Sequence, residues 1–197
     1  MNKRTLQGME TKKRLIECAR KLFKEKGYNN VTVDDIIKEA NSSKGGFYTH
    51  FKTKEELLIN MLPLVDDAYL AFLNMGIKTE NSIEKISLFI QHAFKIIEEE
   101  IGLAFISAIY SSHIKDSTKN RFLIAPDRAY NQLLKKLIEE GQEKKEIRRE
   151  LTPEHAATIL TSCIRGVVYD WCLYKGEFNL AQYGNEVLNM MLNQLKL

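Results

Sequence analysis

The stretch that decides the fold runs from Thr32 to Leu58 and reads TVDDIIKEANSSKGGFYTHFKTKEELL. Its first apolar residues recur at helical spacing, Thr32 offers an N-cap hydroxyl, and two aspartates stand in the first turn. We therefore predict a helix over 32–40. Asn41 follows where a left-handed residue would end that helix, because asparagine tolerates a positive φ better than most residues.

A second, shorter helix follows this turn. Ser42 or Ser43 can cap a helix from Lys44 to Phe51, in which Phe47 and Phe51 share one side and are predicted to be core. Two helices and a turn of this length are typical of a helix-turn-helix, whose second helix enters the major groove of DNA. Such hairpins also occur in bundles that bind no DNA, so the spacing alone leaves both interpretations open.

The same periodicity extends in both directions. Upstream it predicts a helix over 11–26 that ends at Gly27. Downstream, Thr53 begins a long apolar run that contains Pro63, which predicts a connecting helix kinked at the proline. Three further helices are expected. The first is capped by Ser82, the second covers 101–114, and the third has Pro126 in its first turn and ends at Gly141.

Two long helices close the chain. Thr152 and Pro153 form an N-cap and N1 pair for a helix over 153–174, and the pair Lys175-Gly176 separates it from a helix over 180–195. No strand alternation competes with these patterns. The predicted fold class is all-α with about nine helices: an N-terminal three-helix helix-turn-helix domain over 1–54 and a C-terminal helical domain over 55–197.

Composition and charge favour a globular protein with one basic module. Of 197 residues, 44% are hydrophobic and 28% charged, which is typical of a chain with a real core. Residues 1–54 carry 13 Lys and Arg against 6 Asp and Glu, a net charge of +7, whereas residues 55–197 carry 16 against 20, a net of −4, which together give +3. Such an asymmetry indicates a polyanion-binding module, although a basic run is often only a solvated face.

The sequence gives no support for a secreted protein, a membrane protein, an enzyme or a metal-binding protein. The N-terminus has no apolar segment like that of a signal peptide, and no run is long enough to span a membrane, so a cytoplasmic protein is expected. The histidines are scattered, and no nucleophile with a base, phosphate loop or metal-ligand spacing is found, so we expect no enzyme, no metal and no cofactor. Three widely spaced cysteines are predicted to be reduced core residues: Cys18, Cys163 and Cys172.

The segment Thr32–Leu58, with the preceding RLIECARKLFKEKGYNNVTV, closely resembles the N-terminal signature of the TetR family of bacterial repressors. The resemblance is dense over about the first sixty residues and thins beyond them to a helix pattern. Asn41 stands where a turn glycine is common, and Ser42 where a small apolar residue is frequent. The resemblance implies a homodimeric, DNA-binding transcriptional regulator, a repressor that a small hydrophobic ligand releases from a palindromic operator.

The candidate DNA contacts follow from the residues and from this resemblance. Lys44 can reach a phosphate or a base edge. Gly45 and Gly46 have no side chains, so the helix backbone can come close to the DNA; the alternative is that the two glycines mark a frayed loop. Tyr48 and His50 match positions that contact the DNA backbone in the family. The predicted set is Thr32, Ser43, Lys44, Gly45, Gly46, Tyr48, Thr49, His50 and Lys54.

The C-terminal segment SCIRGVVYDWCLYKGEFNLAQYGNEVLNMMLNQL is similar to the closing helix pair of the family, which pairs two chains as a four-helix bundle. Gly166 would permit close packing there; a monomer core is the alternative. The resemblance also places a ligand site among Phe72, Phe94, Phe105, Tyr110, Phe122, Cys163, Trp171 and Tyr174. Two other functions remain open: a helical DNA-binding protein of chromosome organisation without an inducer, and a ligand-binding helical protein with a degenerate helix-turn-helix.

Overall fold

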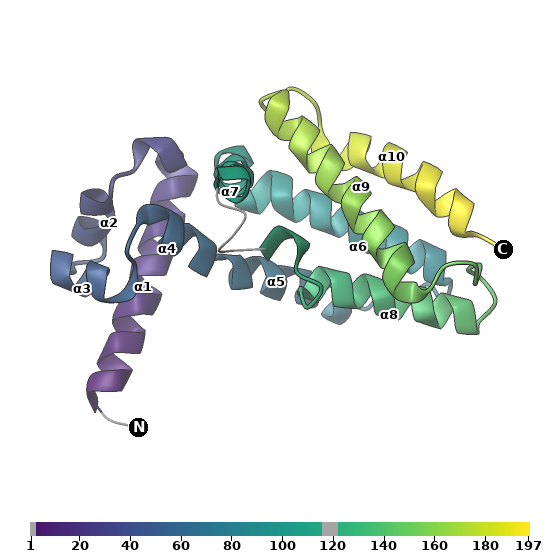
Figure 1. The fold of residues 1–197 in the computed structure, drawn as a ribbon, viewed down its shortest axis with the longest axis horizontal. Helices are drawn as coiled ribbons and strands as arrows, with labels where there is room; N and C mark the ends of the chain where they lie inside the picture. Colours follow the sequence, from purple (N-terminus) through teal and green to yellow (C-terminus); the bar gives the residue numbers. More distant parts are fainter. Residues whose placement is uncertain (1–2, 116–121) are drawn as a thin grey trace. The chain divides into compact units, whose positions relative to one another are not determined.

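The computed structural model describes residues 3–115 and 122–197, and over these residues it contains ten α-helices and no strand (Figure 1). The all-α prediction is confirmed. No helix within the described ranges is long and apolar enough to cross a membrane. The chain forms two compact units, one of residues 1–64 with 104–115 and one of residues 65–103 with 116–197.

The first unit is built around one long helix. It comprises α1 (Lys3–Lys26), the 3-10 turn η1 (Tyr28–Asn30), α2 (Val33–Glu39), α3 (Lys44–His50), α4 (Lys54–Asn60) and α7 (Leu103–Lys115). α1 packs against η1, α2 and α3. Leu15, Ala19, Leu22 and Phe23 of α1 are buried, as are Ile36, Phe47 and Phe51, so the predicted core positions of both phenylalanines are confirmed. α1 begins about two turns earlier than the predicted residue 11.

Side-chain caps hold the short helices α2 and α3 in place. The Thr32 hydroxyl accepts the backbone N–H of Asp35 at 3.1 Å, and the Asp35 carboxylate accepts the backbone N–H of Thr32 at 2.8 Å, which is a capping box. Asn41 has φ 45°, as predicted for the residue that ends α2. Ser43, rather than Ser42, caps α3 by accepting the N–H of Gly46 at 3.0 Å.

The predicted long, kinked connecting helix is wrong. α4 ends at Asn60, α5 (Leu62–Ala71) begins two residues later, and the 3-10 turn η2 (Phe72–Asn74) follows. Between them the N–H of Met61 donates to the carbonyl of Leu58 at 3.0 Å, which tightens the last turn of α4. A proline two residues later has no N–H to continue the helical ladder, so the chain breaks instead of bending. The side chain of Pro63 lies outside the described residues.

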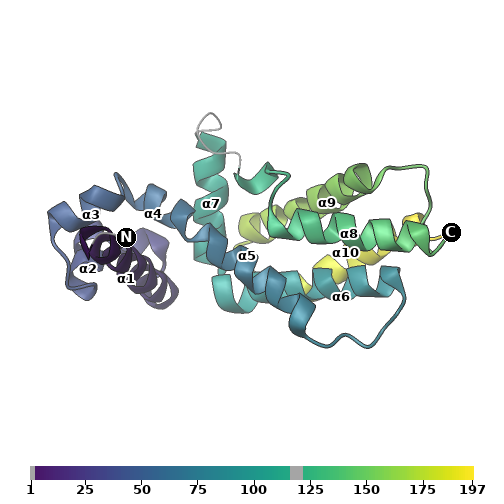
Figure 2. The same cartoon turned by 90° about the horizontal axis from the view of Figure 1, so that it is seen from below.

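The second unit is a helical bundle (Figure 2). It contains α5, η2, α6 (Ser82–Lys95), the π-helical segment η3 (Ile96–Ile101), the 3-10 turn η4 (Phe122–Ile124), α8 (Ala129–Glu143), α9 (Pro153–Leu173) and α10 (Leu180–Leu195). α6 lies beside α8 and α10, and α9 lies beside the same two helices. The core is apolar and comes from all four helices, with Ile86, Phe89, Ile90, Phe94, Leu134, Ile138, Leu160, Val168 and Leu188 buried.

Two predicted helix starts in this unit are wrong by one to three residues. Asn81 caps α6 by accepting the N–H of Glu84 at 3.0 Å, whereas Ser82 is the buried first residue of the helix. α8 begins at Ala129 with Arg128 as its N-cap, and Pro126 lies in the preceding turn. At α6 the residue that caps stands next to the predicted one, whereas at α8 the N-cap Arg128 makes no side-chain cap hydrogen bond.

Gly141 does not end α8, which continues to Glu143. A Cβ on this glycine would lie 2.5 Å from Cδ1 of Ile147 and 2.9 Å from the Cβ of Ser82. The glycine is therefore required by packing inside the helix. By contrast, the predicted start and end of α9 are confirmed: Thr152 accepts the N–H of His155 at 3.2 Å, and the chain turns at Lys175 and Gly176, both with positive φ.

The prediction that the cysteines belong to the core is wrong. Cys18, Cys163 and Cys172 are free thiols, but each is partly exposed. Burial nevertheless raises the pKa of the Cys18 thiol above its ordinary value.

Candidate functional site

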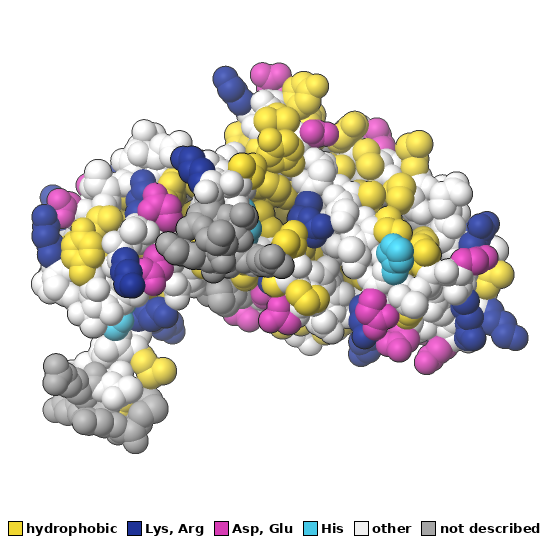
Figure 3. All heavy atoms as spheres, viewed as in Figure 1, with side chains coloured by type: hydrophobic (Ala, Val, Ile, Leu, Met, Phe, Trp, Pro, Cys, Tyr) yellow, Lys and Arg dark blue, Asp and Glu magenta, His cyan; other side chains and the backbone are white. Residues whose placement is uncertain are grey.

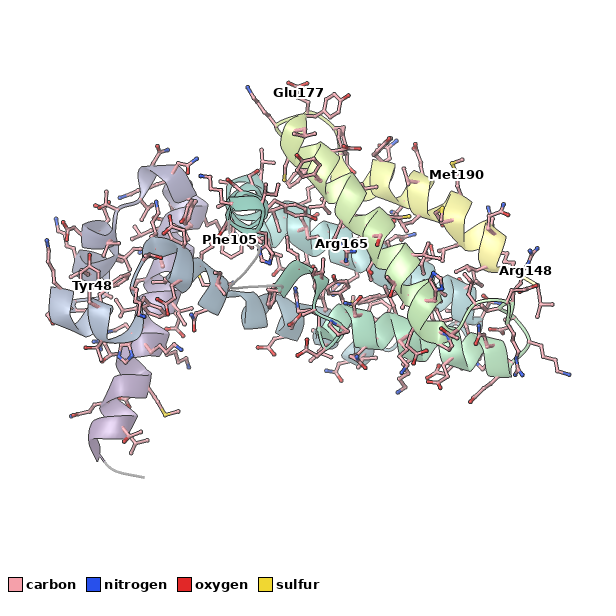
Figure 4. All side chains as sticks on the ribbon, in the orientation of Figure 1. Tyr48, Phe105, Arg148, Arg165, Glu177 and Met190 are labelled. Atoms are coloured by element: carbon pink, nitrogen blue, oxygen red, sulfur yellow. The ribbon has the colours of Figure 1, made fainter. Side chains whose placement is uncertain are left out.

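α3 has one buried and one exposed face. Phe47 and Phe51 are fully buried with ring centroids 5.6 Å apart, so the helix is anchored to the core by two phenyl rings. Tyr48 is 55% exposed, and the edge of its ring lies against that of Phe47 with centroids 5.4 Å apart (Figure 4). The other exposed predicted contacts of α3 and its cap share this surface: Ser43, Lys44, Gly45 and Thr49. The structure thus assembles five of the nine predicted contacts on one helix face.

The two glycines of α3 differ in what surrounds them. A Cβ on Gly45 would lie 3.9 Å from Oγ of Ser43, an ordinary contact. A Cβ on Gly46 would lie 2.8 Å from Oγ of Ser42 and 3.3 Å from Oγ of Ser43, so an alanine here would require the Ser42 hydroxyl to move. Both glycines are helical, which removes the alternative of a frayed loop. Packing within the chain therefore restricts a side chain at position 46 but not at position 45.

Hydrogen bonds within α3 limit what its polar side chains can do. The Thr49 hydroxyl donates to the carbonyl of Gly45 at 2.7 Å, so toward a partner it can only accept. The Ser43 hydroxyl accepts the N–H of Gly46 and keeps its own hydrogen to donate. His50 is half-buried, and its Cε1 lies 3.7 Å from the position of a Cβ on Gly8 of α1. Ser43 is thus the better placed hydroxyl donor.

The predicted phosphate clamps Lys54 and Thr32 have partners inside the chain. Nζ of Lys54 donates to the carbonyls of Tyr28 and Val31, both at 2.9 Å, and lies 4.1 Å from the ring centroid of Tyr28. The Thr32 hydroxyl donates to the Asp35 carboxylate at 2.6 Å, and these bonds hold the pKa of Asp35 below its usual value. Thr32 thus caps α2, and Lys54 ties the start of α4 to η1 and the residue after it.

The eight predicted ligand residues are spread over five helical elements and one loop. Phe72, Phe94 and Trp171 are buried in the second unit. Phe94 lies under Gly184, where a Cβ would come within 2.3 Å of its ring, and the Trp171 indole N–H donates to the carbonyl of Phe178 at 3.0 Å. The others are Phe122 on η4 and Cys163 on α9, both half-exposed, Phe105 and Tyr110 on α7 of the first unit, and Tyr174, which is 60% exposed after α9.

The sequence analysis missed a buried ion pair in the second unit. Arg128 is 6% exposed, its Nε lies 2.8 and 2.9 Å from the two carboxylate oxygens of Asp66, and its Nη2 lies 2.8 Å from one of them. The guanidinium carbon is 3.5 Å from the ring centroid of Phe122. Two features of the sequence could have indicated the pair: Asp66 interrupts an apolar run, and Arg128 precedes a helix.

Two tyrosines border this ion pair. The rings of Tyr69 and Tyr130 lie 5.8 Å apart, and the guanidinium of Arg128 is 5.1 Å from the ring of Tyr130. Burial raises the pKa of the Tyr69 phenol, which stays neutral at ordinary pH. Arg165 of α9 reaches the Tyr130 hydroxyl at 3.4 Å. Asp66, Tyr69, Phe122, Arg128 and Tyr130 thus form one cluster around a partly buried ion pair.

Several apolar side chains are exposed on α9 and α10, among polar ones (Figure 3). They include Leu173, Tyr183 and Met190, the last 71% exposed and pointing away from α10 (Figure 4). A Cβ on Gly166 of α9 would meet no atom within 4 Å. Packing within one chain therefore explains neither this glycine nor the exposed apolar side chains.

Comparisons with known proteins agree with this architecture. Residues 15–61 match the family model "Bacterial regulatory proteins, tetR family", and residues 67–194 match the model "YsiA-like protein, C-terminal region". The fatty acid metabolism regulator protein of Bacillus subtilis is 24% identical over 182 residues, which cover 91% of this chain and 92% of that protein.

Solved structures share the fold. A TetR-family transcriptional regulator from Pectobacterium atrosepticum superposes with a TM-score of 0.80 at 18% identity, over 100% of this chain and 98% of that one. The repressor FadR of Thermus thermophilus, solved in complex with lauroyl-CoA, superposes with a TM-score of 0.67 at 19% identity, over 92% of this chain and 93% of that one.

Proposed function

This chain belongs to the TetR family of bacterial regulatory proteins, and on that premise we propose that it acts as a homodimeric repressor of a palindromic operator, released by a small hydrophobic ligand. The observation that carries the proposal is the exposed face of α3, where Lys44, Gly45 and Tyr48 stand on a helix anchored by buried rings. A helix of this kind fits the major groove when its backbone can come close to the bases.

The contacts have distinct roles in this proposal. Lys44 supplies the charge that reaches a phosphate or a guanine edge, and Gly45 lets the backbone approach. Tyr48 contacts a phosphate or a thymine methyl group, and the Ser43 hydroxyl donates to a phosphate. His50, Thr49 and Gly46 complete the α3 surface. Thr32 and Lys54 act mainly by placing the N-termini of α2 and α4, whose positive dipole ends attract phosphates.

The outer face of α9 and α10 is proposed as the dimer interface. Exposed apolar helix faces need a partner in water, and a two-fold dimer covers the same face on both chains. A glycine lowers the stability of a helix, and Gly166 relieves no clash within the chain. Its lack of a side chain would let two α9 helices cross closely in a dimer. Two α3 helices related by this axis would read half-sites about 34–36 Å apart, one turn of DNA.

The effector is proposed to be a hydrophobic molecule held inside the second unit. Two of the similar proteins concern fatty acids by name: one regulates fatty acid metabolism, and one was solved with lauroyl-CoA. A long-chain acyl-CoA is therefore the first effector to test. The ligand acts by binding better to the dimer whose α3 helices are wrongly spaced for DNA, since only differential affinity shifts such an equilibrium.

The proposal is tested by selecting duplexes from a random library with the purified chain and then titrating the selected duplex with effectors. We expect an inverted repeat whose half-site centres are one helical turn apart, and release by lauroyl-CoA but not by free coenzyme A. Recovery of no enriched sequence would refute an operator-binding repressor. Enrichment without release by any acyl-CoA would refute only this effector class.

A further inference from the structure

A buried arginine of the second unit is held in place by aromatic rings as well as by its counter-ion. The side chain of Arg128 is 7% exposed, and its guanidinium carbon lies 3.5 Å from the ring centroid of Phe122 and 5.1 Å from that of Tyr130. Contacts between a cation and a ring of this kind do not depend on the carboxylate of Asp66. The guanidinium would therefore keep its place if that carboxylate left.

The two partners of this ion pair differ in their access to water. The Asp66 side chain is 21% exposed and belongs to α5, whereas Arg128 directly precedes α8. A carboxylate that turns toward water regains its hydration, but a buried guanidinium needs another anion in its place. A buried ion pair also adds little net stability compared with apolar residues of the same size. Folding stability alone therefore does not explain why the bundle keeps this pair.

A neutral hydrogen-bond donor belongs to the same cluster. Tyr69 is 7% exposed, and its ring lies 5.8 Å from that of Tyr130. Burial raises the pKa of its phenol, and the charges of Arg128 and Asp66 also act on it, so the phenol is near both. Within the described part of the chain, the Tyr69 hydroxyl has no hydrogen-bond partner. Because a buried hydroxyl without a partner is costly, an oxygen atom of a ligand would stabilise it.

We propose that Arg128 receives an anionic head group of the effector, which takes the place of the Asp66 carboxylate and accepts a hydrogen bond from the Tyr69 hydroxyl. This inference rests on the proposed function, because it gives the hydrophobic effector of the second unit a charged end. A carboxylate or a phosphate can present two oxygens to one guanidinium, as Asp66 does. The rings of Phe122 and Tyr130 provide apolar surface beside it. The ligand is thus an anionic amphiphile whose head group is the carboxylate of a fatty acid or a phosphate of an acyl-CoA.

Loss of either charge of the pair affects anionic and neutral ligands differently. Asp66→Asn removes the carboxylate that competes with the head group, so the affinity for an anionic ligand rises. Arg128→Gln removes the receptor and leaves Asp66 to repel the head group, so that affinity falls. A hydrogen bond to a charged group corresponds to about 10- to 150-fold in affinity. A neutral ligand with the same alkyl chain makes no use of the charge and reports any change in the shape of the site.

The experiment measures the affinity of the full-length protein for laurate, lauroyl-CoA and dodecanol by isothermal titration calorimetry. The unmodified protein is compared with Asp66→Asn, Arg128→Gln and the double variant D66N/R128Q. The double variant has no uncompensated charge at this position, so it tests the site even if a single variant is destabilised. Glu154→Gln is the matched control, because Glu154 forms an exposed ion pair with Lys135 between α8 and α9 of the same unit. Thermal unfolding verifies that each variant is folded.

The measured quantity is the ratio of the affinity for an anionic probe to the affinity for dodecanol. We expect this ratio to rise by at least about tenfold in Asp66→Asn and to fall by as much in Arg128→Gln. It should lie below that of the unmodified protein in the double variant and stay unchanged in Glu154→Gln. A change for laurate assigns a carboxylate head group, and a change for lauroyl-CoA alone assigns a phosphate.

Three results would overturn the inference: an unchanged ratio in either single variant, a raised ratio in the double variant, or binding of no probe by a protein that still binds its selected operator. Failure of the unmodified protein to bind any operator would instead refute the proposed function, whatever its preference among the three probes.

Discussion

Replacing Gly45 by alanine should move stability and DNA affinity in opposite directions. Glycine in a helix costs about 0.5–1 kcal/mol relative to alanine. Because a Cβ at Gly45 would meet its nearest neighbour at 3.9 Å, nothing in the chain opposes that gain. For a chain of this size, 1 kcal/mol shifts Tm by about 2–4 °C. We therefore expect Gly45→Ala to raise Tm by about 1–4 °C.

The same methyl group should weaken binding to the operator. It enlarges the face of α3 that also carries Lys44 and Tyr48, so the backbone cannot approach the bases as closely. Loss of one good base contact costs about 1–3 kcal/mol. At the lower limit, the two recognition helices of a dimer lose about 2 kcal/mol together, which weakens binding about 30-fold.

The assay pairs thermal unfolding followed by circular dichroism with anisotropy titration of the selected operator. Gly46→Ala is the matched control in the same helix, because its Cβ would press on Oγ of Ser42 at 2.8 Å and so should gain less stability than Gly45→Ala. Operator binding by Gly45→Ala equal to that of the unmodified protein would refute the close-approach role. A lower Tm for this variant would show that a Cβ at position 45 does clash with the rest of the chain.

Three further results are expected. Gly166→Leu should leave the fold intact, since no atom lies within 4 Å of the added Cβ, but should give a monomer in sedimentation at micromolar concentration; a stable dimer would exclude α9 from the interface. Asp66→Asn should lower the free energy of unfolding by up to about 3 kcal/mol in urea, because it leaves the buried charge of Arg128 without its counter-ion; an unchanged midpoint would contradict this. The bonds to Thr32 lower the pKa of Asp35, so the stabilisation that its carboxylate provides is present above its unfolded pKa of about 3.9 and is lost as pH falls through the folded value. In urea titrations from pH 7 to 3, Asp35→Asn should therefore lose less stability than the unmodified protein.

Local signals predicted the helix-turn-helix well. The cap at Thr32, the left-handed Asn41 and the buried pair Phe47 and Phe51 each follow from chemistry within a few residues. Such features depend on backbone geometry and periodicity, which a single sequence displays directly.

Features that depend on distant residues could not be predicted in this way. Gly141 has the appearance of a helix stop, yet it is required by the side chain of Ile147 and lies inside α8. The pairing of Asp66 with Arg128 joins residues 62 positions apart, and no local pattern indicates it. Likewise, Lys54 donates its hydrogen bonds to backbone carbonyls more than twenty residues upstream. Tertiary contacts decided each of these cases.

Two copies of α3 are proposed to bind one duplex through the exposed face that carries Lys44, Gly45 and Tyr48. The most direct test is sedimentation velocity of the unmodified protein with a labelled duplex taken from upstream of its own gene, repeated from 50 to 300 mM salt. The account predicts two chains, or a whole multiple of two, on each bound duplex and an affinity that falls steeply with salt. A single chain per duplex, or retention that does not change with salt, would contradict it.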